Sequence, residues 1–151
     1  MIEIKWNKLT QVLNDYADYF INKARQNIID NNSVATGKLM NTMEKIIEIN
    51  DNKISVKIKL QDYWNDLENG QQPFTLGIAT IKDWIEVKNL DLNPYAVQKK
   101  IQREGTDAHP FFNDAKDETY KIFEQRITYA IEEDIAQWVI DNVNEIFKNY
   151  K

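Results

Sequence analysis

The sequence predicts an α+β fold in which a small antiparallel β-sheet, a hairpin over residues 45–61, packs against an amino-terminal helix and a long carboxy-terminal helix. Apolar residues recur at steps of three and four over residues 5–30, as they do on one face of a helix. They alternate with polar residues over 45–61, which is typical of half-buried strands. Helical spacing then returns after Phe111, and neither glycine nor proline interrupts it up to Lys151.

The first helix should end in the Asp30–Ser33 segment, where residues that favour turns and helix caps cluster. Its wide apolar face is formed by Trp6, Leu9, Leu13, Tyr16, Phe20, Ala24 and Ile28. In the hairpin, residues 50–52 are the expected turn between the two strands. A hairpin alone is only marginally stable in water, so its apolar face must be covered, and the first helix is the nearest cover.

Short helices are expected between the hairpin and the last helix. Tyr63, Trp64 and Leu67 share one helical face, and Gly70 ends that segment. A second short helix is expected from residue 78 to about 88. Pro94 suits the first turn of a third, because its missing N–H group is not needed there.

A stiff turn precedes the last helix. Gly105 is a natural C′ residue for the preceding helix, since glycine adopts the left-handed conformation without a Cβ penalty. Pro110 prevents helix continuation and favours an extended conformation at His109. Phe111 and Phe112 should then be largely buried and lock the last helix onto the body, with Asn113 or Asp114 as N-cap.

The last helix should run for about 37 residues, or roughly 55 Å at about 1.5 Å per residue. That is longer than one small domain needs to cover its core. We therefore expect a single domain over residues 1–151, in which residues after about 139 extend to a neighbouring subunit or project from the body. Most aromatic residues should be core, and Trp64 and Trp138 are the best candidates for an interface.

Composition argues against most enzyme classes. The chain has no cysteine and one histidine, and its four glycines form no phosphate-binding loop. We predict no catalytic residue, no cofactor and no metal site. No apolar run approaches the roughly 20 residues of a membrane-spanning helix, so no membrane partner is expected.

Charged clusters have plain interpretations. The acidic run Glu132–Asp134 should be a solvated helix face. Lys99, Lys100 and Arg103 form the densest basic cluster, and an exposed helix face is favoured there over contact with nucleic acid. The net charge of −5 argues against a general phosphate-binding surface.

The order of these elements resembles the tail-component and head–tail joining proteins of tailed bacteriophages, a family that includes tail-completion and neck proteins. The likeness covers almost the whole chain and rests on the order and spacing of short motifs. The matching residues are Thr36, Gly37, Lys38 and Leu39; Tyr63 with Leu67, Glu68, Asn69 and Gly70; the segment Ile101–Thr106, which includes Arg103 and Gly105; and His109, Pro110, Phe111 and Phe112. Asn69 departs from the acidic-aromatic-glycine pattern usual in the family, and the final helix is unusually long.

The resemblance implies a non-enzymatic virion protein, assembled in the bacterial cytoplasm, that forms a homo-oligomeric ring of six or twelve copies at the phage neck. Its partners would be portal, connector or tail-tube proteins, with DNA as a passive passenger through the channel. A stand-alone helical interaction module or regulator is the alternative. An enzyme is a third and weaker possibility, because no nucleophile, metal or cofactor constellation can be assembled from these residues.

Overall fold

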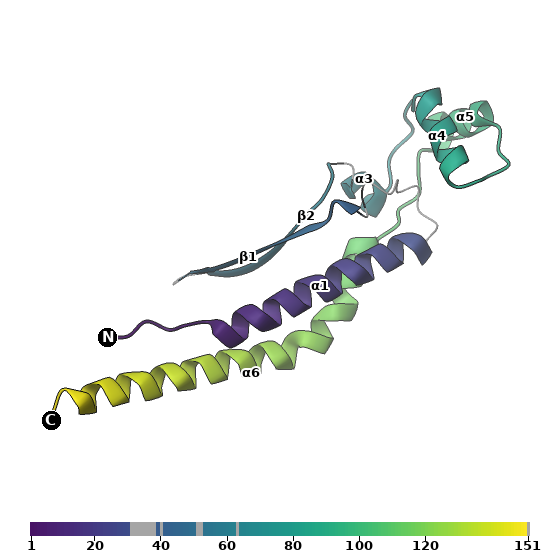
Figure 1. Ribbon diagram of the computed structural model, residues 1–151. Helices are drawn as coiled ribbons and strands as arrows, with labels where there is room; N and C mark the ends of the chain where they lie inside the picture. Colours follow the sequence, from purple (N-terminus) through teal and green to yellow (C-terminus); the bar gives the residue numbers. More distant parts are fainter. Residues whose placement is uncertain (31–38, 40, 51–52, 63, 151) are drawn as a thin grey trace. The chain divides into compact units, whose positions relative to one another are not determined.

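The computed structural model describes residues 1–30, 39, 41–50, 53–62 and 64–150 of the 151-residue chain. The predicted α+β class is confirmed, with an amino-terminal helix, a two-stranded antiparallel sheet and a long carboxy-terminal helix. In chain order the elements in Figure 1 are α1 (Asn7–Asp30), β1 (Glu44–Asn50), β2 (Lys53–Lys59), α3 (Trp64–Asn69), α4 (Ile78–Val87), α5 (Pro94–Glu104) and α6 (Phe111–Lys148).

The chain forms two compact units. The first is built from Met1–Asn22, Lys45–Ile58 and Lys116–Lys151, and the second from Lys23–Glu44 and Lys59–Ala115. Both α1 and α6 contribute residues to each unit. Whether the units unfold together as one domain stays a prediction.

In the first unit α1 and α6 run antiparallel (Figure 1). Residues later in α1 contact residues earlier in α6, as expected for two antiparallel helices. The Arg126 guanidinium donates to the Asp15 carboxylate at 3.0 Å, and the rings of Tyr19 and Phe123 lie 5.5 Å apart. Further toward the termini, the backbone N–H of Ile2 donates to the Asn142 side chain at 3.1 Å.

The apolar core of this unit joins both helices to the hairpin. Leu9 and Leu13 of α1 and Ala130 of α6 are buried at its centre. Partly buried apolar side chains from the helices, the strands and the amino-terminal segment surround them: Trp6, Val12, Ile47, Ile49, Val56, Ile127 and Ile131. The alternation predicted over 45–61 therefore sets one face of the hairpin against the helices, as expected.

The other hairpin face carries a polar cluster. Lys57 Nζ lies 3.1 Å from Glu48 Oε2, and the Ser55 hydroxyl is 3.4 Å from the same oxygen. The hydrogen bond from Lys57 lowers the pKa of the exposed Glu48 carboxyl. Such cross-strand pairs hold the register of a two-stranded sheet, although an exposed ion pair adds little stability.

Short helices of the second unit begin and end where the sequence indicates. The Asn93 side chain accepts hydrogen bonds from the backbone N–H groups of Tyr95 at 2.9 Å and Ala96 at 3.3 Å, so it caps α5. Pro94 occupies the first turn, and Gly105 follows the last residue of α5. Helix α4 packs beside α5, where the Lys82 ammonium lies 5.8 Å from the centre of the Tyr95 ring.

Helix α6 is continuous over 38 residues, which confirms the predicted long helix. It begins at Phe111, three or four residues earlier than the caps predicted at Asn113 or Asp114 would allow. Among the described helices none is long and apolar enough to cross a bilayer.

Candidate functional site

Two motif segments that are about 35 residues apart in the sequence meet in the second unit. Gln71 and Thr106 form an isolated antiparallel bridge, with N–H···O distances of 3.1 and 2.9 Å in the two directions. Next to it, the backbone N–H of His109 donates to the carbonyl of Leu67 at 2.8 Å. The segment that ends α3 is thereby tied to the segment that joins α5 to α6.

The two glycines beside this bridge are required by its geometry. Gly70 and Gly105 have φ values of +72° and +75°, which side chains rarely adopt. A Cβ atom on Gly70 would lie 2.5 Å from the Thr106 carbonyl oxygen, and one on Gly105 would lie 2.0 Å from the Gln71 carbonyl oxygen. Because neither glycine has a side chain, the backbone of the other segment can approach it closely.

The Glu68 carboxylate caps α6. One of its oxygens accepts the backbone N–H of Phe112 at 2.8 Å, and the other accepts that of Asn113 at 3.0 Å. The side chain is only 3% exposed. Because the first N–H groups of a helix lack partners within the helix and carry partial positive charge, a buried carboxylate is stabilised there. This cap replaces the one predicted from Asn113 or Asp114.

Aromatic packing closes the same cluster. Phe111 is completely buried and Phe112 is half-buried, so the predicted burial is confirmed for Phe111 and partly for Phe112. The Trp64 ring lies 5.4 Å from that of Phe112. The Asn27 amide, buried on α1, donates to the Phe111 carbonyl at 3.2 Å. We call the set Glu68, Gly70, Gly105, Phe111 and Phe112 the motif cluster.

The other predicted site residues are not members of the motif cluster. Leu39 is fully buried, His109 is half-buried, Pro110 is exposed, and Arg103 is exposed with its guanidinium hydrogen-bonded to Glu104. Thr36, Gly37 and Tyr63 lie outside the described residues.

Trp138 belongs to the first unit, where its indole N–H donates to the carbonyl of Ile2. The hydrogen bond shows that the polar atom of Trp138 has a partner within the chain. The role of Trp138 at an interface stays a prediction.

Asp134 was missed by the sequence reasoning, which placed it on a solvated face. It is 5% exposed, and its two oxygens accept the backbone N–H groups of Lys8 at 3.0 Å and Leu9 at 2.9 Å. Each long helix is thus capped by a buried carboxylate from elsewhere in the chain. The sequence did carry a signal, because Asp134 continues the helical spacing of Ile127 and Ile131 and so lies on the apolar face, where a carboxylate needs a partner.

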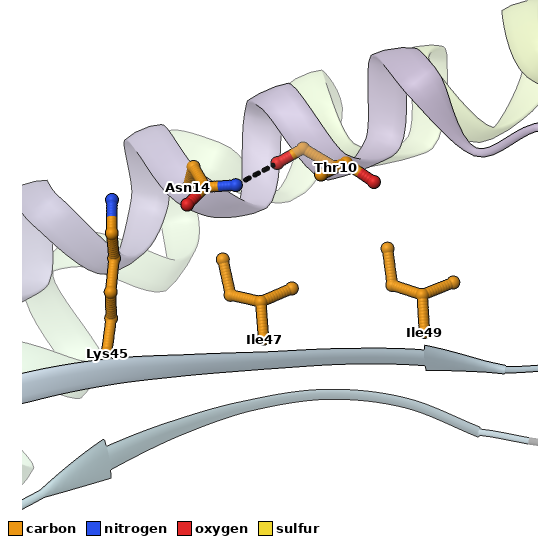
Figure 2. A pocket seen from close by; sticks show the side chains of 5 residues that line it. All are labelled: Thr10, Asn14, Lys45, Ile47 and Ile49. Atoms are coloured by element: carbon orange, nitrogen blue, oxygen red, sulfur yellow. Dashed lines mark hydrogen bonds between the residues drawn. The ribbon is translucent and has the colours of Figure 1, made fainter.

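A groove lies between α1 and β1 in the first unit, with a volume of about 360 Å³. Figure 2 shows Ile47 and Ile49 rising from β1 toward Thr10 and Asn14 of α1, with Lys45 at one end. Asn14 donates to the Thr10 carbonyl at 2.9 Å, and Lys45 pairs with Asp18 at 2.8 Å. These groups suit apolar and hydrogen-bonding contacts more than proton transfer.

Acid–base or metal chemistry has little support in the motif cluster. Within residues 1–30, 39, 41–50, 53–62 and 64–150, no group of three His, Asp or Glu side chains is arranged to hold a metal ion. The polar atoms of Glu68 are already used by backbone N–H groups. The cluster ties the first residues of α6 to the end of α3, which is a structural task.

Replacing Glu68 with glutamine should lower the free energy of unfolding by about 1.5–3 kcal/mol, because the buried cap loses its charge and one acceptor oxygen. Urea denaturation at low protein concentration measures the change. The matched control is Glu124→Gln on the exposed side of α6, which should shift the value by less than about 0.5 kcal/mol. Equal effects of the two substitutions would show that the cap is unimportant.

No family model, curated protein or solved structure matches the chain.

Proposed function

We propose that the chain is a structural subunit that assembles as a ring of identical copies at the neck of a tailed bacteriophage, between head and tail, leaving a channel for DNA. The observation that carries the proposal is the meeting of the motifs. Residues named by the resemblance at Glu68 and Gly70, at Gly105, and at Phe111 and Phe112 lie in one cluster, joined by backbone hydrogen bonds and a buried carboxylate.

This clustering supports the resemblance because short motifs matched by chance have no reason to be neighbours in space. Gly70 and Gly105 each lie against the backbone of the other's segment, and the Glu68 carboxylate accepts a hydrogen bond from the first turn of α6. The motifs that the resemblance names in order along the chain are thus the residues that hold the first turn of α6 in place.

Surfaces suited to assembly are also present. The sheet has two strands among the described residues, so each strand leaves a backbone edge that another chain can extend. The carboxy-terminal part of α6 exposes large apolar side chains. Two different contact surfaces on one subunit allow head-to-tail interfaces, and these close into a ring when the rotation between copies fits.

Native mass spectrometry of the purified chain tests the proposal. We expect one dominant assembly of six or twelve copies that persists on dilution. A monomer, or a monomer–dimer mixture across the same concentrations, would contradict the ring and favour the helical interaction module.

The proposed channel leads to a prediction about DNA. The subunit carries a net charge of −5, and a ring repeats that charge around its opening. On α5, Lys99, Lys100 and Arg103 are exposed, but Arg103 already donates to Glu104 and lowers the pKa of that carboxyl. We expect no tight binding of duplex DNA at physiological salt, so affinities of roughly 10⁻⁸ M should be out of reach.

Fluorescence anisotropy with a labelled duplex measures this affinity, and the triple variant K99A/K100A/R103A serves as the comparison. Both proteins should bind equally weakly. Submicromolar binding by the natural sequence that falls steeply with salt and disappears in the triple variant would make the basic cluster a DNA-binding site, and the passive channel would be wrong.

A further inference from the structure

The carboxy-terminal part of α6 carries apolar side chains on a face that the first unit leaves open. We call this set the C-terminal stripe, and every large member is between 40% and 85% exposed. Its members are Ile135, Ala136, Val139, Ile140, Val143, Ile146 and Phe147, continued by Tyr150 just beyond the end of the helix.

The stripe is separate from the face that α6 uses for its own core. Phe123, Ala130 and Asp134 are buried against the rest of the first unit. With about 100° between successive residues, these positions lie on the opposite side of the helix from the stripe. Trp138 and Asn142, which contact Ile2, lie between the two faces.

No charged side chain interrupts the stripe. Placed at about 100° per residue, its helical members fill an arc of roughly 140°, and every residue of 135–148 that falls in this arc is apolar. Asp141, Glu145 and Lys148 fall outside it. Identical stripes can therefore meet without opposing like charges, which makes other copies of the chain suitable partners.

The exposed area also fits a protein partner. The exposed fractions of these residues amount to a total area on the order of 700 Å², compared with roughly 800 Å² that each partner contributes to one stable interface. A contact that uses half of this area must therefore be completed by other surfaces of the subunit. Monomeric soluble proteins rarely expose an apolar patch larger than about 600 Å² on their surface.

The width of the arc decides how many copies meet. Two helices that pair in a coiled coil need only a narrow apolar seam, which is much narrower than the arc present here. A helix that is apolar over roughly 140° has two flanks that can face different neighbours. Ile146 lies on one flank of the stripe and Phe147 on the other, only about 1.5 Å apart along the axis of α6.

We infer that the C-terminal stripe packs against the same segment of two neighbouring copies, one on each flank, so that the carboxy-terminal halves of α6 form a parallel bundle around the axis of the assembly. This inference rests on the proposed ring, and it identifies the surface through which neighbouring copies contact one another. It also gives the unusual length of α6 a purpose, because residues after about 139 are needed for contacts between copies.

Substituting Val143, at the centre of the stripe, with glutamate should weaken assembly at least tenfold, because it places charges between apolar neighbours. The control is Asn144→Glu, which adds the same charge at an exposed position outside the arc and should leave assembly unchanged. Sedimentation velocity over a range of concentrations measures assembly, and circular dichroism checks that both variants are folded.

Cysteine cross-linking gives a second readout, since the natural sequence has no cysteine. A disulfide forms only when two Cβ atoms come within about 4.5 Å, so it reports close neighbours. We expect the double variant I146C/F147C to give a ladder of cross-linked multimers on a non-reducing gel, and each single variant to give little product. Efficient dimers from I146C alone would indicate a symmetric pair and overturn the two-flank arrangement, as would a double variant that does not cross-link.

The two proposals can fail separately. If both the natural sequence and Val143→Glu form closed rings, the stripe is not the contact and the ring stands. If the double variant gives the multimer ladder while the natural sequence forms open filaments and no ring, the stripe contact stands and the neck function is wrong.

Discussion

Truncating Phe111 to alanine should lower the free energy of unfolding by about 3–5 kcal/mol, which is the usual cost of removing a buried aromatic side chain and leaving a cavity. Phe111 is completely buried, and its backbone carbonyl accepts the Asn27 amide. The substitution removes the ring and keeps the backbone, so the loss reports packing. Phe112→Ala should have a smaller effect, because Phe112 is only half-buried.

Urea denaturation at low protein concentration gives this free energy without a contribution from assembly. Tyr120→Ala is the matched control, since it truncates an aromatic residue of the same helix that is 51% exposed. It should change stability by less than about 1 kcal/mol. If Phe111→Ala and Tyr120→Ala unfold at the same urea concentration, Phe111 does not anchor α6. A single transition would also support the predicted single domain.

Replacing Gly105 with alanine should destabilise the protein by about 3 kcal/mol, because φ and ψ values of +75° and −152° are almost restricted to glycine. The new Cβ would also lie 2.0 Å from the Gln71 carbonyl oxygen, so the bridge between Gln71 and Thr106 has to open. The expected result is a lower unfolding midpoint together with faster hydrogen exchange at the backbone N–H groups of Gln71 and Thr106.

Gly77→Ala is the control for this substitution. Gly77 has φ −61° and ψ 137°, which any residue adopts, and the nearest atom to its added Cβ would be 3.9 Å away. As an N-cap position it should lose no more than about 1 kcal/mol. A Gly105→Ala variant as stable as Gly77→Ala would mean that the two motif segments do not need their close approach.

Local features of the fold could be predicted from the sequence, because each depends on neighbours in the chain. The spacing of Leu9 and Leu13 indicated α1, Pro94 marked the first turn of α5, and Gly105 marked its end. The period of two over 45–61 gave the hairpin and its buried face. In each case the physical cause lies within a few residues of the feature.

Features that depend on distant partners could not be predicted in the same way. Glu68 caps a helix that begins more than 40 residues later, so nothing near it in the sequence reveals its role. The cap expected at Asn113 or Asp114 was wrong for the same reason, since the helix start is held from outside the segment. Asp134 was misread because acidic residues on helices are usually solvated, and only its position on the apolar face argued otherwise.

Electron microscopy of the purified chain, with class averages viewed along the symmetry axis, tests the proposed ring most directly. We predict closed rings with an open central channel and six- or twelve-fold symmetry, and the same images of Val143→Glu should contain mostly single subunits. Averages of the natural sequence that contain only compact particles without a channel, at concentrations where the protein is folded, would contradict a neck subunit.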